Sequence, residues 1–213
     1  MTSNTNTHFD SLLFDMDGTL WDAVNSYCAV WNATIDICCP STPHVEYDAL
    51  AEMMGKPLEV IYARFIGDAY PVDEFMKVLL EQESILMPRL GGVLYPDVTS
   101  TIAKLAENHR LFMVSNCTPE GLPNFLAFTG LTQYFSDHIS YGETGCEKDI
   151  NIATLIKRHN LTAPLYIGDT EGDCNSAHKA GIPFAWASYG FGAAPATRDY
   201  TLDTITDLLS ICK

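Results

Sequence analysis

Residues 11–22 read SLLFDMDGTLWD, and this stretch sets the expectations for the rest of the chain. An apolar run, Leu12 to Phe14, leads directly into two acids one residue apart, Asp15 and Asp17, and a glycine follows. Two carboxylates at the end of a buried strand repel each other unless a positive charge lies between them. A metal ion is the most direct source of that charge, so the stretch predicts a strand that ends in a metal site.

Short apolar runs recur later in the chain and end in small or polar residues. They are LFMVSN (111–116), LYIGD (165–169) and IPFAWAS (182–188), with DHIS (137–140) as a weaker strand candidate. Runs that are apolar throughout suit a parallel sheet covered on both faces. Helical periodicity lies between them, for example over residues 98–106, 152–159 and 170–180. This alternation predicts an α/β fold with right-handed crossovers.

The region from residue 22 to residue 90 has a different character. It contains helical patterns at 23–37, 45–54, 57–67 and 71–87, is punctuated by prolines and has no convincing strand. We interpret it as a helical insertion placed directly after the first strand. The expected division is an α/β core of residues 1–21 plus 91–213 and a helical insertion of residues 22–90.

Polar residues stand at the ends of the predicted core strands. Because ligands bind at the carboxyl ends of strands in a parallel sheet, we expect these residues to share one crevice. They are Asp15, Asp17, Ser115, Asn116, Asp169 and, nearby, Asp173 and Lys148. Clustered carboxylates favour Mg²⁺, and a carboxylate can attack phosphorus while a lysine and a hydroxyl bind the phosphoryl oxygens. The set is typical of phosphoryl transfer.

Four motifs, DMDGTL, VSN, Lys148 and GDTEGD, together resemble the signatures of the haloacid dehalogenase superfamily, in order and over nearly the whole chain. The opening motif is most similar to the phosphoglycolate-phosphatase-like branch. The resemblance implies a Rossmann-like parallel sheet with strand order 5-4-1-2-3 and a helical cap. It also implies a nucleophile at Asp15 and a general acid–base at Asp17, with Ser115 and Lys148 binding phosphate.

The resemblance further implies a magnesium site. Asp15 and Asp169 would ligate Mg²⁺, with Asp17 contributing its backbone carbonyl and Asp173 acting directly or through water. We also expect Gly18, Thr19 and Asn116 to contact the phosphate group.

Substrate specificity should come from the cap. Lys56, in the expected loop MMGKPLEV, is the candidate to bind an anionic leaving group, with an ordinary solvated lysine as the alternative, and Arg64 is the next candidate. Four aromatic residues could line a pocket but more often form the core between cap helices: Trp21, Trp31, Tyr62 and Phe65.

Composition restricts the partners. With 27 acids, 12 bases and a net charge of −15, the surface should repel nucleic-acid backbones and anionic membranes. The polar N-terminus, the lack of a membrane-length apolar run and seven irregularly spaced cysteines predict a cytoplasmic protein with free thiols. A zinc site is a minor alternative that would use Cys117, Cys146, Cys174 and His178.

The sequence therefore predicts a Mg²⁺-dependent phosphatase that hydrolyses a small phosphomonoester through an aspartyl-phosphate. A phosphomutase of the same superfamily, acting on a sugar phosphate, is an alternative, because it keeps both Asp15 and Asp17. A non-enzymatic module that binds phosphate and metal is the less favoured alternative. Phosphoglycolate, a sugar phosphate and a nucleotide all remain open as substrates, and so does the oligomeric state.

Overall fold

The computed structural model describes residues 8–212. Most of the polar N-terminus that contributes to the expectation of a cytoplasmic protein therefore lies outside the described residues. A six-stranded sheet, parallel throughout, has the order β5-β4-β1-β6-β7-β8. Its strands are β1 (Ser11–Phe14), β4 (Arg110–Ser115), β5 (Phe135–Ser140), β6 (Pro164–Gly168), β7 (Phe184–Ala187) and β8 (Tyr200–Leu202). The α/β class is confirmed. The expected order 5-4-1-2-3 corresponds to β7-β6-β1-β4-β5, and β8 adds a sixth strand at the edge beyond β7.

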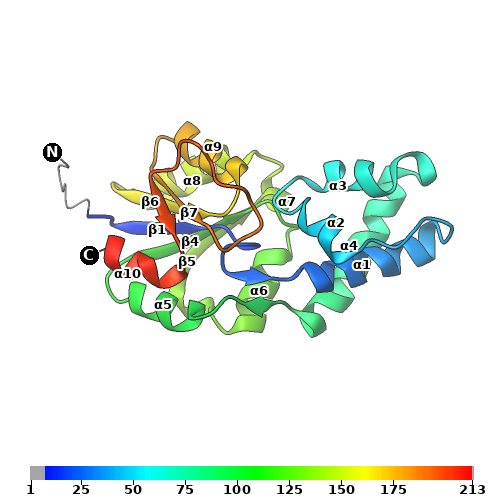
Figure 1. Cartoon of the computed structure of the whole chain (residues 1–213), viewed down its shortest axis with the longest axis horizontal. Coiled ribbons are helices and arrows are strands. Elements are labelled where there is room, and N and C mark those ends of the chain that lie inside the picture. Colours follow the sequence, from blue (N-terminus) through cyan, green and yellow to red (C-terminus); the bar gives the residue numbers. More distant parts are fainter. Residues whose placement is uncertain (1–7, 213) are drawn as a thin grey trace.

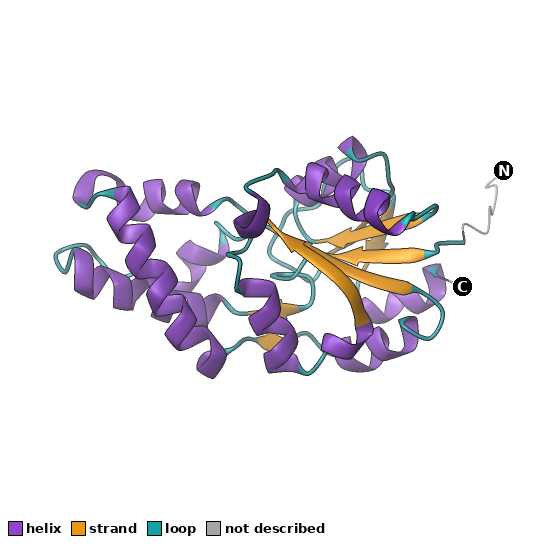
Figure 2. Ribbon diagram, turned by 180° about the vertical axis from the view of Figure 1, so that it is seen from behind, coloured by secondary structure: helices purple, strands orange, loops and turns teal. Residues whose placement is uncertain are grey.

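Helices cover both faces of this sheet (Figures 1 and 2). On one face α8 (Lys148–His159) and α9 (Glu171–Lys179) pack on a core that includes Leu13. On the other face α5 (Val98–Leu105), α6 (Gly121–Thr129) and α10 (Leu208–Ile211) pack on a core that includes Leu12 and Phe14. Successive side chains of a strand point to opposite faces, so a strand buried on both sides must be apolar at every position.

The predicted cap region is helical, as its sequence indicates. It contains α1 (Val24–Cys38), α2 (Tyr47–Ala51), α3 (Leu58–Phe65), a 3₁₀ turn η1 (Gly67–Ala69) and α4 (Val72–Leu90). Helices α1 and α4 pack against each other. Aromatic rings fill the space between the helices, with the centroid of Phe75 lying 5.6 Å from that of Trp31 and 5.4 Å from that of Tyr62. The division into cap and core at residues 22 and 90 stays a prediction.

A short antiparallel ribbon joins these two regions. It pairs β2 (Trp21–Asp22) with β3 (Val93–Leu94), and each strand has only two residues. Sequence patterns do not detect strands this short, because period-two alternation needs about four residues or more to be visible. The ribbon holds the chain at both ends of the helical insertion.

The remaining elements are short turns that connect the strands and helices of the core. They are η2 (Thr132–Tyr134), α7 (Tyr141–Thr144) and η3 (Ile205–Asp207). Within residues 8–212, no helix combines the length and the apolar character needed to cross a membrane.

Candidate active site

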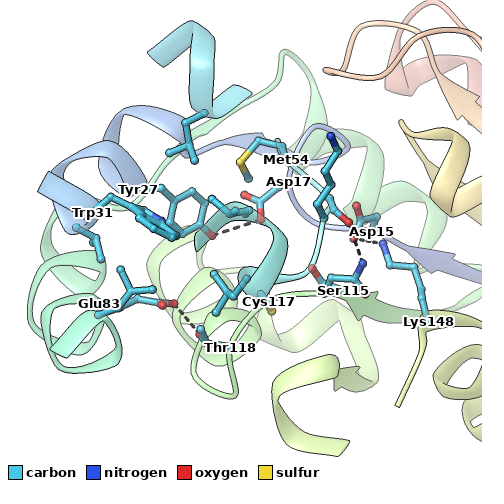
Figure 3. Close-up of a pocket in the computed structure, with 18 residues that line it drawn as sticks. Asp15, Asp17, Tyr27, Trp31, Met54, Glu83, Ser115, Cys117, Thr118 and Lys148 are labelled. Atoms are coloured by element: carbon cyan, nitrogen blue, oxygen red, sulfur yellow. Dashed lines mark hydrogen bonds and ion pairs between the residues drawn. The ribbon is translucent and has the colours of Figure 1, made fainter. Parts of the chain in front are cut away.

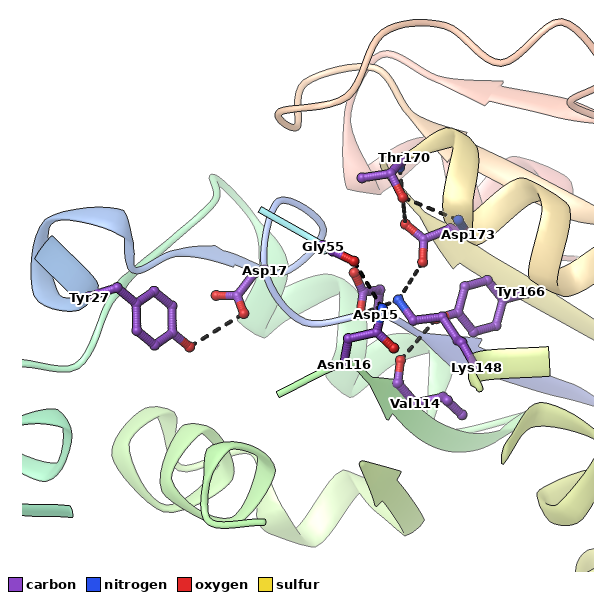
Figure 4. Close-up of polar contacts among 10 residues, drawn as sticks. All are labelled: Asp15, Asp17, Tyr27, Gly55, Val114, Asn116, Lys148, Tyr166, Thr170 and Asp173. Atoms are coloured by element: carbon purple, nitrogen blue, oxygen red, sulfur yellow. Dashed lines mark hydrogen bonds and ion pairs between the residues drawn. The ribbon is translucent and has the colours of Figure 1, made fainter. Parts of the chain in front are cut away.

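Four of the predicted site residues meet at the carboxyl ends of neighbouring strands (Figure 4 shows Asp15 and Lys148). Asp15 follows β1, Ser115 ends β4, Asp169 follows β6, and Lys148 opens α8. All four are at most 5% exposed. Ionisable groups are rarely buried this completely unless they are paired or functional.

Lys148 neutralises part of this buried charge. Its Nζ lies 3.1 Å from Asp15 Oδ1 and 2.5 Å from Asp173 Oδ1 (Figure 4). Burial lowers the pKa of Lys148, but the two carboxylates outweigh burial and raise it well above its usual value. Burial raises the pKa of Asp15 to about 6, with Lys148 opposing the change. One cation is therefore shared between two carboxylates, and Asp169 remains without a cationic partner among the described residues.

Asp169 has one oxygen that is satisfied and one that is not. Its Oδ2 accepts hydrogen bonds from the backbone N–H groups of Phe191, at 2.8 Å, and Gly192, at 3.2 Å. Its Oδ1 is fully buried and has no hydrogen-bond partner among the described residues. Burial and the nearby carboxylates of Asp173 and Asp15 raise the pKa of Asp169 well above its usual value. A buried carboxylate oxygen without a hydrogen-bond donor is free to ligate a cation.

Asp173 is already engaged by protein donors. Its Oδ2 accepts hydrogen bonds from the N–H and the hydroxyl of Thr170, and its N–H donates to the Thr170 hydroxyl, which makes a capping box at the start of α9. Its Oδ1 accepts from Lys148. Asp173 therefore fixes both the helix start and the lysine, in addition to facing the acidic cluster.

The acidic cluster has the composition that a magnesium site requires. Asp15, Asp169 and Asp173 each offer a carboxylate oxygen, and these oxygens lie within 4.8 Å of one another. Oxygen ligands are those that Mg²⁺ prefers. The orphaned Oδ1 of Asp169 and the shared Lys148 both indicate a deficit of positive charge, so the residues present fit a divalent cation. The Asp17 carboxylate is not part of this cluster.

Asp17 lies apart from the cluster and faces the cap. Its Oδ1 accepts a hydrogen bond from Trp21 Nε1 at 2.8 Å, and its Oδ2 accepts from the Tyr27 hydroxyl at 3.3 Å. Burial, together with the charge of Asp15, raises the pKa of Asp17 to about 8. Both effects favour the protonated form of Asp17, whereas Lys148 favours the ionised form of Asp15. A difference in this direction suits a nucleophile at Asp15 and a general acid at Asp17.

A cavity of about 70 Å³ connects these groups (Figure 3). Its lining combines core residues with residues from the cap helices and the loop at Gly55, and most of it is apolar. Asp15, Asp17, Ser115, Asn116, Lys148 and Lys56 all line it. A water-sized group occupies about 10–15 Å³ by this measure, so the cavity holds about five to seven such groups. This size suits a small ligand.

Besides the Tyr27–Asp17 contact, two further hydrogen bonds join the cap to the core at this cavity. Asn116 Nδ2 donates to the carbonyl oxygen of Gly55 at 2.9 Å, and the Thr118 hydroxyl donates to Glu83 Oε1 at 2.6 Å. Asn116 thus uses its side chain to hold the cap loop. The predicted contact of Asn116 with phosphate stays a prediction.

Gly18 and Thr19 do not line the cavity. Gly18 has φ +77°, and a Cβ atom there would lie 2.3 Å from Asp169 Oδ2, so only glycine lets the chain turn so close to this carboxylate. Thr19 is fully buried, and its carbonyl oxygen accepts a hydrogen bond from the Tyr189 hydroxyl. Their predicted contact with phosphate stays a prediction.

The four aromatic residues considered for the pocket fall into two groups. Trp31 lines the cavity, whereas Trp21, Tyr62 and Phe65 do not. Trp21 is buried beside Asp17, and the Tyr62 hydroxyl donates to the Gly67 carbonyl oxygen. Lys56 is exposed at the rim, with Nζ 3.6 Å from the Met53 sulfur.

The zinc alternative is wrong. Within residues 8–212, the acidic cluster is the only group of three possible ligands close enough to share an ion. Cys174 and His178 lie together, with Sγ and Nδ1 3.8 Å apart, but neither Cys117 nor Cys146 completes a site with them.

Sequence reasoning missed Tyr27, Glu83 and the backbone donors at Phe191 and Gly192. Tyr27 and Glu83 come from cap helices, and their positions on those helices show only ordinary helical spacing. The loop that carries the Phe191 and Gly192 donors has the sequence SYGFG (188–192), and its two glycines were the signal that could have identified it. A Cβ at Gly192 would lie 2.2 Å from the Asp169 carbonyl oxygen, so glycine is what allows this loop to approach Asp169 closely.

Comparisons with known proteins agree with this architecture. Residues 12–187 match the family model of haloacid dehalogenase-like hydrolases. The chain is 26% identical to the phosphoglycolate phosphatase of Aquifex aeolicus, covering 94% of this chain and 95% of that protein, and 26% identical to that of Synechococcus elongatus, covering 93% and 95%.

A solved structure, described as a predicted phosphoglycolate phosphatase from Haemophilus somnus, superposes with a TM-score of 0.83 at 23% identity and covers 99% of this chain and 100% of that one. At this identity the likeness establishes the fold alone. The match to the family model spans most of the chain and includes all four motifs. The protein therefore belongs to the haloacid dehalogenase-like hydrolase family.

Proposed function

We propose that the protein is a Mg²⁺-dependent phosphatase that hydrolyses a small phosphomonoester through an aspartyl-phosphate on Asp15. The observation that carries the proposal is that Asp15, held against Lys148, and Asp17, whose protonated form is favoured by burial, line one small cavity. The curated relatives named phosphoglycolate phosphatase support the same class of reaction.

Asp15 is the nucleophile in this proposal. Lys148 orients its carboxylate and, with the Ser115 hydroxyl, binds the oxygens of the phosphoryl group. Mg²⁺ held by Asp15 and Asp169, with the Asp17 carbonyl oxygen and Asp173 directly or through water, would neutralise the carboxylates and stabilise negative charge on phosphorus oxygens. Asp15 and Asp17 are both buried, which limits the access of bulk water to the reacting atoms.

Asp17 is the general acid and then the general base in this proposal. In the protonated form that burial favours, it donates to the leaving alcohol as Asp15 attacks phosphorus. The resulting carboxylate then accepts a proton from the water that hydrolyses the aspartyl-phosphate. Trp21 and Tyr27 hold the carboxyl group in place through both steps.

Release of inorganic phosphate from p-nitrophenyl phosphate and from a panel of small phosphomonoesters tests the proposal. A phosphatase releases phosphate from each substrate that it turns over. A phosphomutase would instead return an isomeric sugar phosphate, and product analysis with hexose phosphates separates the two. Absence of turnover with every substrate would contradict the proposal and favour a binding module.

Removing the metal is expected to abolish activity. Without a cation the carboxylates of Asp15 and Asp169 repel each other and the incoming phosphate, and Lys148 alone cannot neutralise both. The assay measures phosphate release after dialysis against EDTA and again after adding Mg²⁺. Undiminished turnover in excess EDTA would contradict the metal assignment.

Lys56→Ala is expected to raise the KM for phosphoglycolate by about two- to fivefold, the scale of an exposed ion pair. The KM for p-nitrophenyl phosphate should change less, because its leaving group carries no second anion. Lys77→Ala, which removes an exposed lysine from α4 away from the cavity, is the matched control. Equal effects on both substrates would return Lys56 to an ordinary surface role and make Arg64 the next residue to test.

A further inference from the structure

Glu83 is a buried acid that the proposed chemistry does not use. It lies in the middle of α4, is 7% exposed and lines the cavity. Its Oε1 accepts the hydrogen bond from the Thr118 hydroxyl at 2.6 Å, while its Oε2 has no hydrogen-bond partner among the described residues. One acceptor of a buried carboxyl group is thus left free at the wall of the cavity.

No positive charge within the described part of the chain compensates Glu83. The cavity contains two lysines, and Lys148 is held by Asp15 and Asp173 while Lys56 is exposed at the rim. Neither forms an ion pair with Glu83. Burial raises the pKa of Glu83, against the effect of the Thr118 hydrogen bond. A buried carboxyl group without a cation is costly, so its presence in a binding cavity suggests that a ligand supplies the cation.

Glu83 lies at the end of the cavity that would receive the leaving group of the substrate. In Figure 3, Asp15, Ser115 and Lys148 lie together at one end of the cavity, and Glu83 lies with Tyr27 and Trp31 at the other. Asp17, the proposed acid for the leaving alcohol, lies between the two ends. A phosphoryl group bound at Asp15 therefore directs its alcohol past Asp17 and toward Glu83.

Resting on the proposed function, we propose that Glu83 selects a phosphomonoester whose alcohol carries a protonated amine. The ammonium group would donate a hydrogen bond to the free Oε2 of Glu83 and gain a charge partner there. The rings of Tyr27 and Trp31 offer aromatic surface that also favours a cation. A carboxylate at the same place, as in phosphoglycolate, would face Glu83 with like charge.

Glu83→Gln tests this selection without removing the contact to Thr118. Glutamine has the same shape and keeps an acceptor for the Thr118 hydroxyl, so the link between cap and core is preserved. Glu81→Gln, on the exposed side of the same helix, makes the same change in charge away from the cavity and is the matched control. The substrates are phosphoethanolamine, phosphoglycolate and p-nitrophenyl phosphate.

The wild type is expected to have a higher kcat/KM for phosphoethanolamine than for phosphoglycolate. In Glu83→Gln the ratio of these two values should fall by about tenfold or more, the scale of a lost charge-assisted hydrogen bond. Glu81→Gln should keep the wild-type ratio. A purely structural role for Glu83 would change the kcat/KM for all three substrates together and leave the ratio unchanged.

The outcomes separate this inference from the proposed function. Turnover of p-nitrophenyl phosphate with an equal or reversed preference between the two small substrates would overturn the inference alone. An unchanged ratio in Glu83→Gln would also overturn it. Absence of phosphate release from all three substrates would instead contradict the phosphatase proposal itself.

Discussion

Asp15→Asn is expected to abolish phosphatase activity while leaving the fold intact. An amide cannot attack phosphorus as a carboxylate does, so the covalent step is lost. The side chain keeps its shape at the end of β1, and Lys148 keeps its contact with Asp173, so the sheet and α8 should be unaffected. Phosphate release and the thermal unfolding midpoint, measured on the same preparation, check both parts.

Asp68→Asn provides the control for this variant, because Asp68 is exposed in η1 and away from the cavity. It makes the same chemical change and should keep wild-type kinetics. More than trace turnover in Asp15→Asn, in a preparation free of other phosphatases, would show that Asp15 is not the nucleophile.

Asp17→Asn is expected to slow turnover of alkyl phosphates by about 10²- to 10⁴-fold, the usual scale of general acid–base catalysis. Asparagine preserves the shape that accepts the Trp21 hydrogen bond but cannot donate and recover a proton at neutral pH. The measurement is kcat with a small alkyl phosphate. A loss smaller than about tenfold would place the acid elsewhere.

The pH profile gives a second readout for Asp17. Burial raises its pKa to about 8, so the acid is protonated below that pH and loses its proton above it. Wild-type activity should therefore fall as pH rises through about 8, and this decrease should be absent in Asp17→Asn. A decrease of activity that persists in the variant would show that another group titrates.

The core of the site could be predicted from the sequence because its residues follow recognisable strands. Asp15, Ser115 and Asp169 each stand where an apolar run stops, and parallel strands bring such ends to one edge. Lys148 needed the family resemblance, since a lysine at a helix start is ordinary by itself. The edge strand β8 was missed because three residues, YTL, carry little periodicity.

The cap side of the site could not be predicted in the same way. Tyr27 and Glu83 reach the cavity because α1 and α4 pack together and close over the core, and helical spacing does not say which polar residue faces a cavity. Glu83 meets Thr118 across 35 positions of the sequence. Such contacts follow from tertiary packing, so only the structure locates the end of the cavity that meets the leaving group.

Rapid-quench analysis of Asp17→Asn with radiolabelled p-nitrophenyl phosphate tests the covalent mechanism most directly. This leaving group departs without a proton donor, so Asp15 should still be phosphorylated while hydrolysis of the intermediate lacks its base. We expect a burst of p-nitrophenolate stoichiometric with enzyme, and label on the peptide that contains Asp15. A burst with label on any other peptide, or steady turnover with no label on the chain, would contradict it.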